Sequence, residues 1–128
     1  MNLELNLEPI TKIKEAEGTR FHFFIVGAGG TGGHLIPNLA RLISSINENL
    51  EDNRKHFITL VDADEVEQKN LIRQNFTKSD LGKNKAEVLA TRYSRAFGVT
   101  INYIAEYIES PKMLKERIAQ AYELAAPG

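Results

Sequence analysis

Four glycines in one short stretch are the first residues of this sequence that could do chemistry. Gly27, Gly29 and Gly32 have the G-x-G-x-x-G spacing, and Gly30 adds another position without a side chain. In such a turn the glycines permit a sharp bend, a close approach of the backbone to a phosphate, and tight packing of a helix on a strand. The stretch therefore predicts a phosphate-binding turn at a helix start, although a glycine cluster can also serve only as a tight strand-to-helix turn.

Polar and charged residues later in the chain could complete a nucleotide site. Asp62 follows a second apolar run, where an acidic residue takes the ribose hydroxyls of NAD or ATP; its alternative role is to cap the next turn. Asn70 offers an amide donor, and Arg73 and Lys85 are cations that a triphosphate needs. The alternative for these two cations is a solvated place on the surface.

The elements that must position these residues begin with a strand, a helix and a second strand. The apolar run from Phe21 to Val26 predicts a strand buried on both faces of a parallel sheet, and Phe57 to Val61 predicts another. Apolar residues at three- and four-residue spacing predict a helix over 31–46, with Pro37 in its first turns, where a missing donor costs least. The apolar positions of this helix are Leu35, Ile36, Leu39, Leu42, Ile43 and Ile46.

The second half of the chain continues the alternation. Residues 47–55 are polar and predict a surface connection, and residues 84–97 predict a helix that stops at Gly98. A third strand is predicted over 101–108, followed by a helix that opens at Pro111. These elements predict an α/β fold, a Rossmann-like βαβαβ three-layer module with a mostly parallel sheet. Residues 20–128 would be the nucleotide-binding domain.

Residues 1–19 have a pattern of their own. Leu3, Leu5 and Leu7 alternate with polar residues, which predicts an edge strand or an extended N-terminal arm.

Composition limits the function classes. The chain has 128 residues, 42% of them hydrophobic, and a formal net charge of -1, so there is no overall field to hold nucleic acid or an anionic membrane. The absence of cysteine excludes thiol nucleophiles, cysteine-bound zinc and disulfides within these residues. No long apolar run or signal peptide is present, and we therefore expect a cytoplasmic protein without nucleic-acid or membrane partners.

Three motifs in the same order resemble the ThiF, MoeB and E1 family of adenylating enzymes. After the glycine turn, residues 62–74 are similar to the family pattern D-x-D-x-V-x-x-x-N-L-x-R-Q, and residues 82–86 to G-x-x-K-A. The residues of these motifs are most similar to those of ThiF-type proteins encoded with plasmid PRTRC gene clusters. The resemblance extends over residues 21–108, and it implies that the chain is the N-terminal part of a larger adenylation domain.

The resemblance also implies a reaction and its residues. In the family, ATP activates the C-terminal carboxylate of a ubiquitin-like or sulfur-carrier protein ending in Gly-Gly, giving an acyl-adenylate and pyrophosphate. Arg73 and Lys85 would both bind phosphates and stabilise charge in the reaction. The nucleotide-binding residues would be Gly27, Gly29, Gly30, Gly32, Asp62, Asn70, Arg73 and Lys85. Mg²⁺ is expected with the ATP, although this chain supplies no identified magnesium ligand, and the family forms homodimers or E1-like heterodimers.

Two other functions stay open at this point. A fragment of an NAD(P)-binding oxidoreductase would share the glycine turn and Asp62, but it gives no reason for Asn70, Arg73 and Lys85. A noncatalytic partner subunit of the E1 type is the second alternative. Asp64 could organise the turn that follows it, coordinate magnesium indirectly, or face water.

Overall fold

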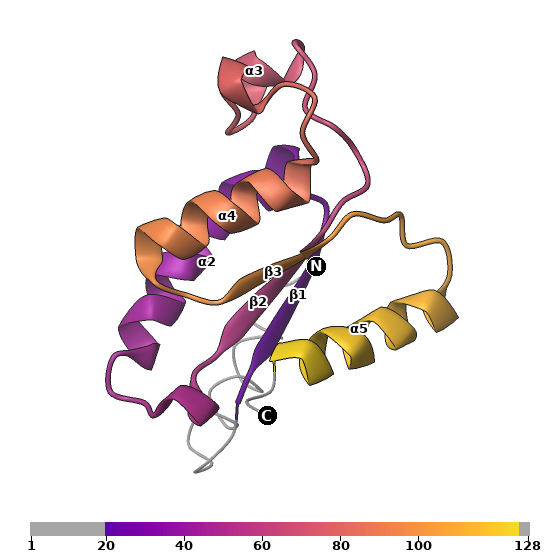
Figure 1. The fold of residues 1–128 in the computed structure, drawn as a ribbon. Helices are drawn as coiled ribbons and strands as arrows, with labels where there is room; N and C mark the ends of the chain where they lie inside the picture. The colour runs from indigo at the N-terminus through magenta and orange to yellow at the C-terminus, as the bar shows by residue number, and fades with distance from the viewer. Residues whose placement is uncertain (1–19, 126–128) are drawn as a thin grey trace.

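The computed structural model describes residues 20–125, which form three layers (Figure 1). Three parallel strands pair in the order β1-β2-β3, with α2 and α4 on one face of the sheet and α5 on the other. In chain order the elements are β1 (His22–Val26), α2 (Gly30–Asn47), η1 (Asp52–Arg54), β2 (Phe57–Val61), α3 (Asn70–Arg73), η2 (Lys78–Asp80), α4 (Lys85–Phe97), β3 (Ile101–Ile104) and α5 (Pro111–Ala125). The predicted Rossmann-like fold is confirmed. The arm or edge strand predicted for residues 1–19 lies outside the described residues.

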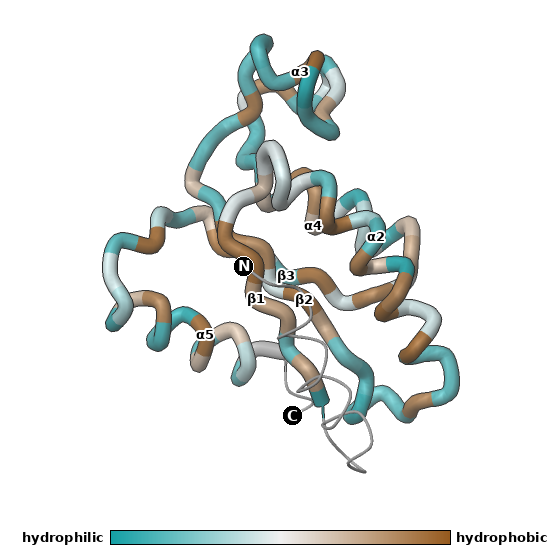
Figure 2. Tube along the Cα trace, turned by 180° about the vertical axis from the view of Figure 1, so that it is seen from behind, coloured by the Kyte–Doolittle hydropathy of each residue, from teal (hydrophilic) through white to brown (hydrophobic). Residues whose placement is uncertain are grey.

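The core lies between the sheet and the α2–α4 layer. Every residue of β2 is buried, and Ile58 and Leu60 face Ile36 of α2 and Leu89 of α4 in one apolar cluster. Figure 2 shows the hydrophobic tube running along the strands between polar connections. Burying each such side chain contributes about 1.5–3 kcal/mol. The prediction of a fully buried second strand is therefore confirmed.

β1 is less buried than the sequence predicts. Its residues are half-buried, and Val26 at its end is 55% exposed. The physical reason is that, within the described residues, β1 pairs only with β2, so one edge has no neighbouring strand. The ring of His22 stacks on Phe57 at 4.3 Å and lies near Tyr122 of α5. Burial and the nearby Arg20 lower the pKa of His22.

α2 departs from its prediction in two ways. Leu35 and Leu42 are exposed, because the face of α2 that packs inward is the neighbouring stripe of Gly33, Ile36, Ala40, Ile43 and Asn47. Pro37 lies inside the helix, beyond its first turn, and leaves the carbonyl of Gly33 without a helical donor. The side-chain amide of Asn75 replaces that donor, with Nδ2 at 3.0 Å from the Gly33 oxygen. The Gly33 carbonyl, which loses its helical donor to the proline, is thus satisfied by a side chain from the segment after α3.

The predicted surface connection after α2 begins with a buried residue. Asn47 closes α2 and exchanges two hydrogen bonds with the backbone of His56, at 3.0 and 2.8 Å. The expectation that residue 47 lies on the surface is therefore wrong, because its amide is used to join the end of α2 to the start of β2.

The ends of α4 match their prediction, and the end of β3 does not. Asn84 caps α4 by accepting from Glu87 N, and Gly98 stops the helix with φ +66°. β3 ends at Ile104, whereas the sequence predicted a strand to residue 108. Ile104 pairs with Val61, the last residue of β2, so within residues 20–125 β2 offers no further strand residue for 105–108 to pair with.

Candidate functional site

The glycine turn joins the end of β1 to the start of α2. Gly27 has φ +105°, where any other residue would be strained. A Cβ on Gly32 would lie 2.0 Å from the carbonyl oxygen of Gly27, so only glycine lets the helix start this close to the strand end. A Cβ on Gly30 would meet no atom within 4 Å. Gly27 and Gly32 are thus needed by the turn itself, while Gly30 is bare backbone beside open space.

The start of α2 has hydrogen-bond donors to offer. The first N–H groups of a helix have no acceptor further back in the helix. The N-cap residue here is Gly29, which has no side chain to accept from them. Such a helix start favours an anion through its N–H groups and its dipole. The turn therefore fits a phosphate group, the ligand expected from the sequence.

Asp62 fastens this turn to the end of β2. Its Oδ2 accepts from Ala28 N at 2.7 Å, and its Oδ1 accepts from Asp64 N at 2.8 Å. The turn-capping role left open by the sequence is therefore present. A carboxylate has about four acceptor positions, so these bonds leave others for a ribose. Binding of ribose by Asp62 stays a prediction.

Lys85 begins α4 beside the same segment. It is only 8% exposed, so the alternative of a solvated surface charge is wrong for this residue. Its ammonium lies 4.0 Å from Oδ2 of Asp64, and its backbone N donates to the Asp64 carbonyl at 2.9 Å. Asn84 Nδ2 adds a bond to the Asp62 carbonyl at 2.7 Å. Asp64 thus contacts Lys85 through both its side chain and its backbone carbonyl.

Asn70 and Arg73 lie on α3, which stands away from the sheet (Figure 1). Asn70 is buried, and its Oδ1 accepts from Glu67 N at 2.8 Å, so its amide shapes the bend before α3. Arg73 has an exposed side chain, while its carbonyl accepts from Nε2 of His34, near the start of α2, at 3.1 Å. The backbone of Arg73 is therefore at the glycine-turn helix, and its guanidinium faces solvent.

Gln74 touches the glycine turn directly. A Cβ on Gly29 would come within 2.9 Å of Gln74 Oε1, so the second glycine of the motif makes room for this side chain. Gln74 Oε1 is buried and has no donor within residues 20–125. A buried acceptor without a donor is costly, and a ligand hydroxyl or a water molecule at the turn would satisfy it.

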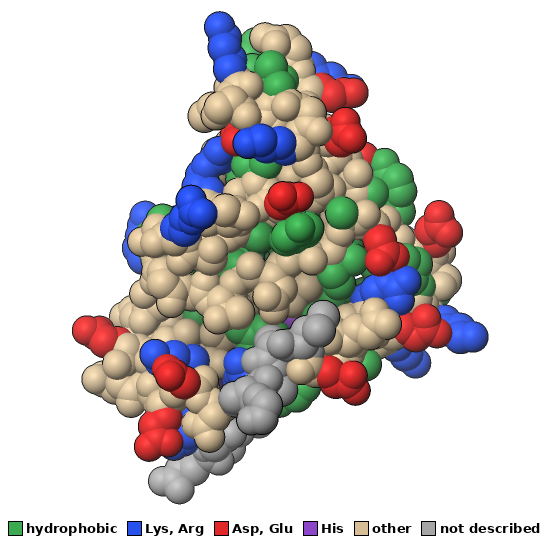
Figure 3. Space-filling view, viewed as in Figure 1, with side chains coloured by type: hydrophobic (Ala, Val, Ile, Leu, Met, Phe, Trp, Pro, Cys, Tyr) green, Lys and Arg blue, Asp and Glu red, His purple; other side chains and the backbone are tan. Residues whose placement is uncertain are grey.

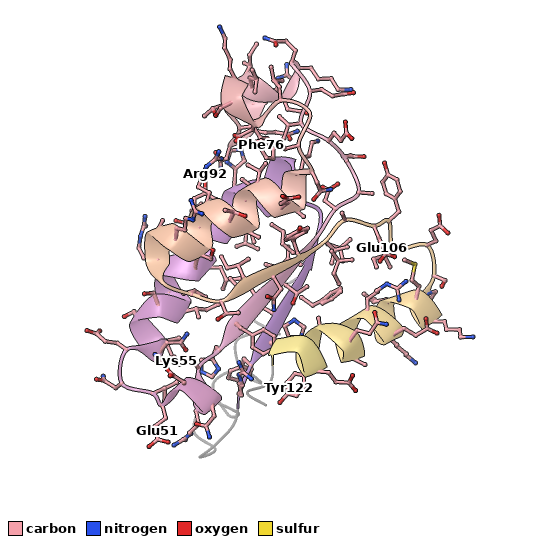
Figure 4. All side chains as sticks on the ribbon, in the orientation of Figure 1. Glu51, Lys55, Phe76, Arg92, Glu106 and Tyr122 are labelled. Atoms are coloured by element: carbon pink, nitrogen blue, oxygen red, sulfur yellow. The ribbon has the colours of Figure 1, made fainter. Side chains whose placement is uncertain are left out.

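Arg92 of α4 fixes the segment that follows α3. Its Nη2 donates to Asp80 Oδ2 at 2.6 Å, and its Nη1 donates to the Asn75 carbonyl at 2.8 Å. Thr77 and Asp80 form a capping box on η2. Burial raises the pKa of Asp80, but the bonds from Arg92 and Thr77 outweigh burial and lower that pKa overall. Figure 4 shows Phe76 and Arg92 where α4 meets this segment.

Sequence reasoning missed the residues that place the α3 segment. The T-x-x-D pattern at Thr77–Asp80 is a capping signal that could have been found. No local signal marks Arg92 or the contact between Asn75 and Gly33, because these partners are far apart in the chain.

The structure brings the predicted residues together in two groups. The glycines, Asp62 and Lys85 form one hydrogen-bonded unit, and Asn70 and Arg73 are joined to it through Gln74 and Asn75. Figure 3 shows Lys and Arg side chains gathered mainly over α3 and the outer side of α4, while both charge signs alternate over α5. Within residues 20–125 no group of three or more His, Asp or Glu side chains could hold a metal ion. None of the described helices is long and apolar enough to cross a membrane.

Comparison with known proteins identifies the family. A family model described as the ThiF family matches residues 3–124. The chain belongs to the ThiF family. No match was found among curated proteins. The three motifs on which the resemblance was based therefore predicted the family correctly.

Solved structures of other ThiF-like proteins share this fold. E. coli MccB with MccA-N7isoASN is 30% identical with a TM-score of 0.61, and the match covers 83% of this chain and 27% of MccB. E. coli MccB with ATP is 30% identical with a TM-score of 0.59, covering 83% of this chain and 28% of MccB. E. coli tRNA N6-threonylcarbamoyladenosine dehydratase, TcdA, in complex with ATP is 24% identical with a TM-score of 0.62, covering 88% of this chain and 40% of TcdA.

The family match and these likenesses show a ThiF-family module with a nucleotide-binding fold. The likeness to TcdA, at 24% identity, shows the fold alone. The chain spans about a quarter of the length of MccB and two fifths of that of TcdA.

Proposed function

We propose that this ThiF-family chain binds ATP, with the phosphates at the glycine turn and the ribose at Asp62. The observation that carries the proposal is the open backbone of Gly30 at the start of α2, on a turn tied to Asp62. The crystal structures of MccB and TcdA with ATP favour ATP over NAD. The two motif cations favour it as well, because both lie on segments bonded to the turn or to Asp62.

The residues of this chain would divide the work. The backbone at Gly29 and Gly30 would hold phosphate, and Asp62 would accept from ribose hydroxyls. Asn70, Arg73 and Lys85 would stabilise the charge that builds up on the phosphates as pyrophosphate leaves. Lys85 would exchange its contact with Asp64 for a phosphate oxygen. Mg²⁺ would accompany the ATP and neutralise part of its charge.

We further propose that the ATP serves to adenylate a carboxylate at the C-terminus of a protein or peptide partner. An ionised carboxylate is already a nucleophile, so this step requires no general base from the chain. The MccB structure with MccA-N7isoASN supports a peptide partner. A carrier ending in Gly-Gly, a dimeric assembly, a cytoplasmic location and a place beside PRTRC genes are finer parts of this proposal. A noncatalytic partner subunit would share the site but give no exchange of pyrophosphate into ATP, with or without the partner protein.

Nucleotide binding tests the proposal directly. We expect ATP to raise the melting temperature of the chain more than NAD or adenosine does, because a bound ligand stabilises the folded chain and only ATP carries a triphosphate for Arg73 and Lys85. Asp62→Asn should weaken adenosine binding, since it removes one of the two carboxylate oxygens but leaves an acceptor for Ala28 N. Thermal unfolding measures the first effect, and titration calorimetry on folded protein measures the second. Equal stabilisation by NAD, or unchanged adenosine affinity in Asp62→Asn, would contradict the assignment.

A further inference from the structure

Tyr107 combines an exposed ring with a fixed hydroxyl. It lies in the connection between β3 and α5 and is 61% exposed. Its hydroxyl nevertheless donates a hydrogen bond to Oδ1 of Asp64. An aromatic ring usually packs inside or moves freely at the surface. Here the hydroxyl of Tyr107 is hydrogen-bonded to Asp64, while the face of its ring is exposed and accessible to a ligand.

The tie places Tyr107 next to the predicted ribose position. Asp64 N donates to Oδ1 of Asp62, so Tyr107 and Asp62 are linked through one residue. The hydrogen bond to Asp64, the charge of Asp64 and that of Asp62 raise the pKa of Tyr107. The hydroxyl therefore stays protonated throughout the neutral range, as the hydrogen bond that it donates to Asp64 requires.

The residues of the connection that flank Tyr107 are hydrogen-bonded to α5 or within its first turn. Glu106 Oε2 accepts from Nε and Nη2 of Arg117 on α5, at 3.2 and 3.0 Å. Ser110 then caps the start of α5 by accepting from Met113 N at 3.1 Å. Figure 4 shows Glu106 on this connection, beside the start of α5. Tyr107 is thus fastened to the Asp62–Asp64 segment while its neighbours are fastened to α5.

The strand order fixes the direction in which a nucleotide would extend. The glycine turn follows β1, Asp62 follows β2, and the Tyr107 connection follows β3, in the spatial order β1-β2-β3. A nucleotide that runs along this edge of the sheet, with its phosphates at the first position and its ribose at the second, would place its base toward the third. The exposed ring of Tyr107 is the aromatic group at that third position.

We propose that Tyr107 forms the base-binding side of the site, as an aromatic platform on which the purine of the nucleotide stacks. This inference depends on the proposed binding of ATP. Stacking of a base on an aromatic side chain needs the ring but not the hydroxyl. The hydroxyl holds the ring in place through Asp64, and the ring gives the site its preference for a large base.

Four ligands separate this role from the alternatives. Titration calorimetry on the full 128-residue chain would compare ATP, CTP, adenosine and inorganic tripolyphosphate, which has neither ribose nor base. In Tyr107→Ala we expect ATP and adenosine affinities to fall about tenfold and the preference for ATP over CTP to shrink. Tripolyphosphate affinity should not change. Tyr107→Phe should keep most of the ATP affinity.

Tyr103→Ala is the matched control. Tyr103 is also an exposed tyrosine, but it lies on β3 beside Ala90 and Ser94 of α4, so its loss should leave all four affinities unchanged. Unchanged ATP affinity in Tyr107→Ala overturns the inference while leaving ATP binding intact. A parallel fall in tripolyphosphate affinity also overturns it, because that result means a structural effect through Asp64 and Lys85. Failure of the wild-type chain to bind ATP overturns the proposed function and this inference together.

Discussion

The glycine turn and the segment that carries Arg73 touch each other but are held in different ways. The turn is held mainly by its backbone, because β1 pairs with β2 up to Val26 and Val61 and Gly27 N donates to the Val61 carbonyl at 2.7 Å. The side chain of Asp62 adds one bond, from Ala28 N. The Arg73 segment is held by side chains that cross between elements, from Asn75 to α2 and from Arg92 to Asp80.

The two regions differ in how much their conformation can change. A turn defined by close backbone contacts has one conformation, because a Cβ at Gly32 would overlap the Gly27 carbonyl. The Arg73 segment is anchored by these side-chain bonds and by Phe76, which packs in the core cluster, so the exposed residues between the anchor points are the ones that can move while the core stays folded. The phosphate turn is thus preformed, and the exposed cation next to it can adjust to a ligand.

The largest effect is expected when the turn itself is changed. Gly32→Ala should lower the free energy of unfolding by about 3 kcal/mol, because the new methyl group forces the helix away from the end of β1. Gly30→Ala is the matched control, since its methyl group would meet no protein atom within 4 Å. We expect Gly30→Ala to keep wild-type stability and to lose ATP affinity. Urea unfolding and calorimetry measure the two properties, and equal stabilities of the two variants would contradict the comparison.

Substituting Arg73 and Lys85 one at a time should have an intermediate effect on ATP affinity. The two variants should differ in their effect on stability. Arg73→Ala should weaken ATP binding about tenfold, leave adenosine binding unchanged and leave the melting temperature unchanged, because this side chain is exposed. Lys85→Met should weaken ATP binding similarly while keeping the buried stem, whereas Lys85→Ala also loses the packing of that stem, about 1 kcal/mol.

The control for both cations is Lys69→Ala, which removes an exposed lysine paired with Glu67 in the same segment. It should leave ATP affinity unchanged. If Arg73→Ala lowered the melting temperature as much as Lys85→Ala, Arg73 would be a structural residue and the contrast between the two regions would disappear.

The smallest effect is expected on the free energy of unfolding at acid pH, through the bond between Arg92 and Asp80. The pKa of Asp80 is lowered in the folded state, so the unfolded chain binds this proton more readily. The stability that results is fully present above the ordinary carboxyl pKa, about 3.9, and is lost as the pH falls through the folded value. Urea unfolding between pH 7 and pH 3 should show this loss in the wild type, and Asp80→Asn should lack that part of it. Glu51→Gln, an exposed carboxylate, serves as the control, and an identical pH profile for Asp80→Asn would refute the assignment.

Local features of this chain could be predicted from the sequence, and long-range ones could not. The glycine turn, β2, and the Asn84 and Gly98 ends of α4 depend on neighbouring residues, so their patterns sufficed. The burial of Lys85 depends on Asp64, 21 positions earlier, and no periodicity shows it. The end of β3 depends on where β2 stops. The same limit hid the bond between Tyr107 and Asp64, which are 43 residues apart.

The proline in α2 has a consequence for the order of folding. Because Pro37 has no N–H, the Gly33 carbonyl in the helix that starts the phosphate turn receives its donor from Asn75, 42 positions later. During synthesis, β1 and α2 can leave the ribosome before that donor exists. The carbonyl of Gly33, at the glycine-rich end of α2, therefore receives its hydrogen-bond donor only after the chain has been made through Asn75.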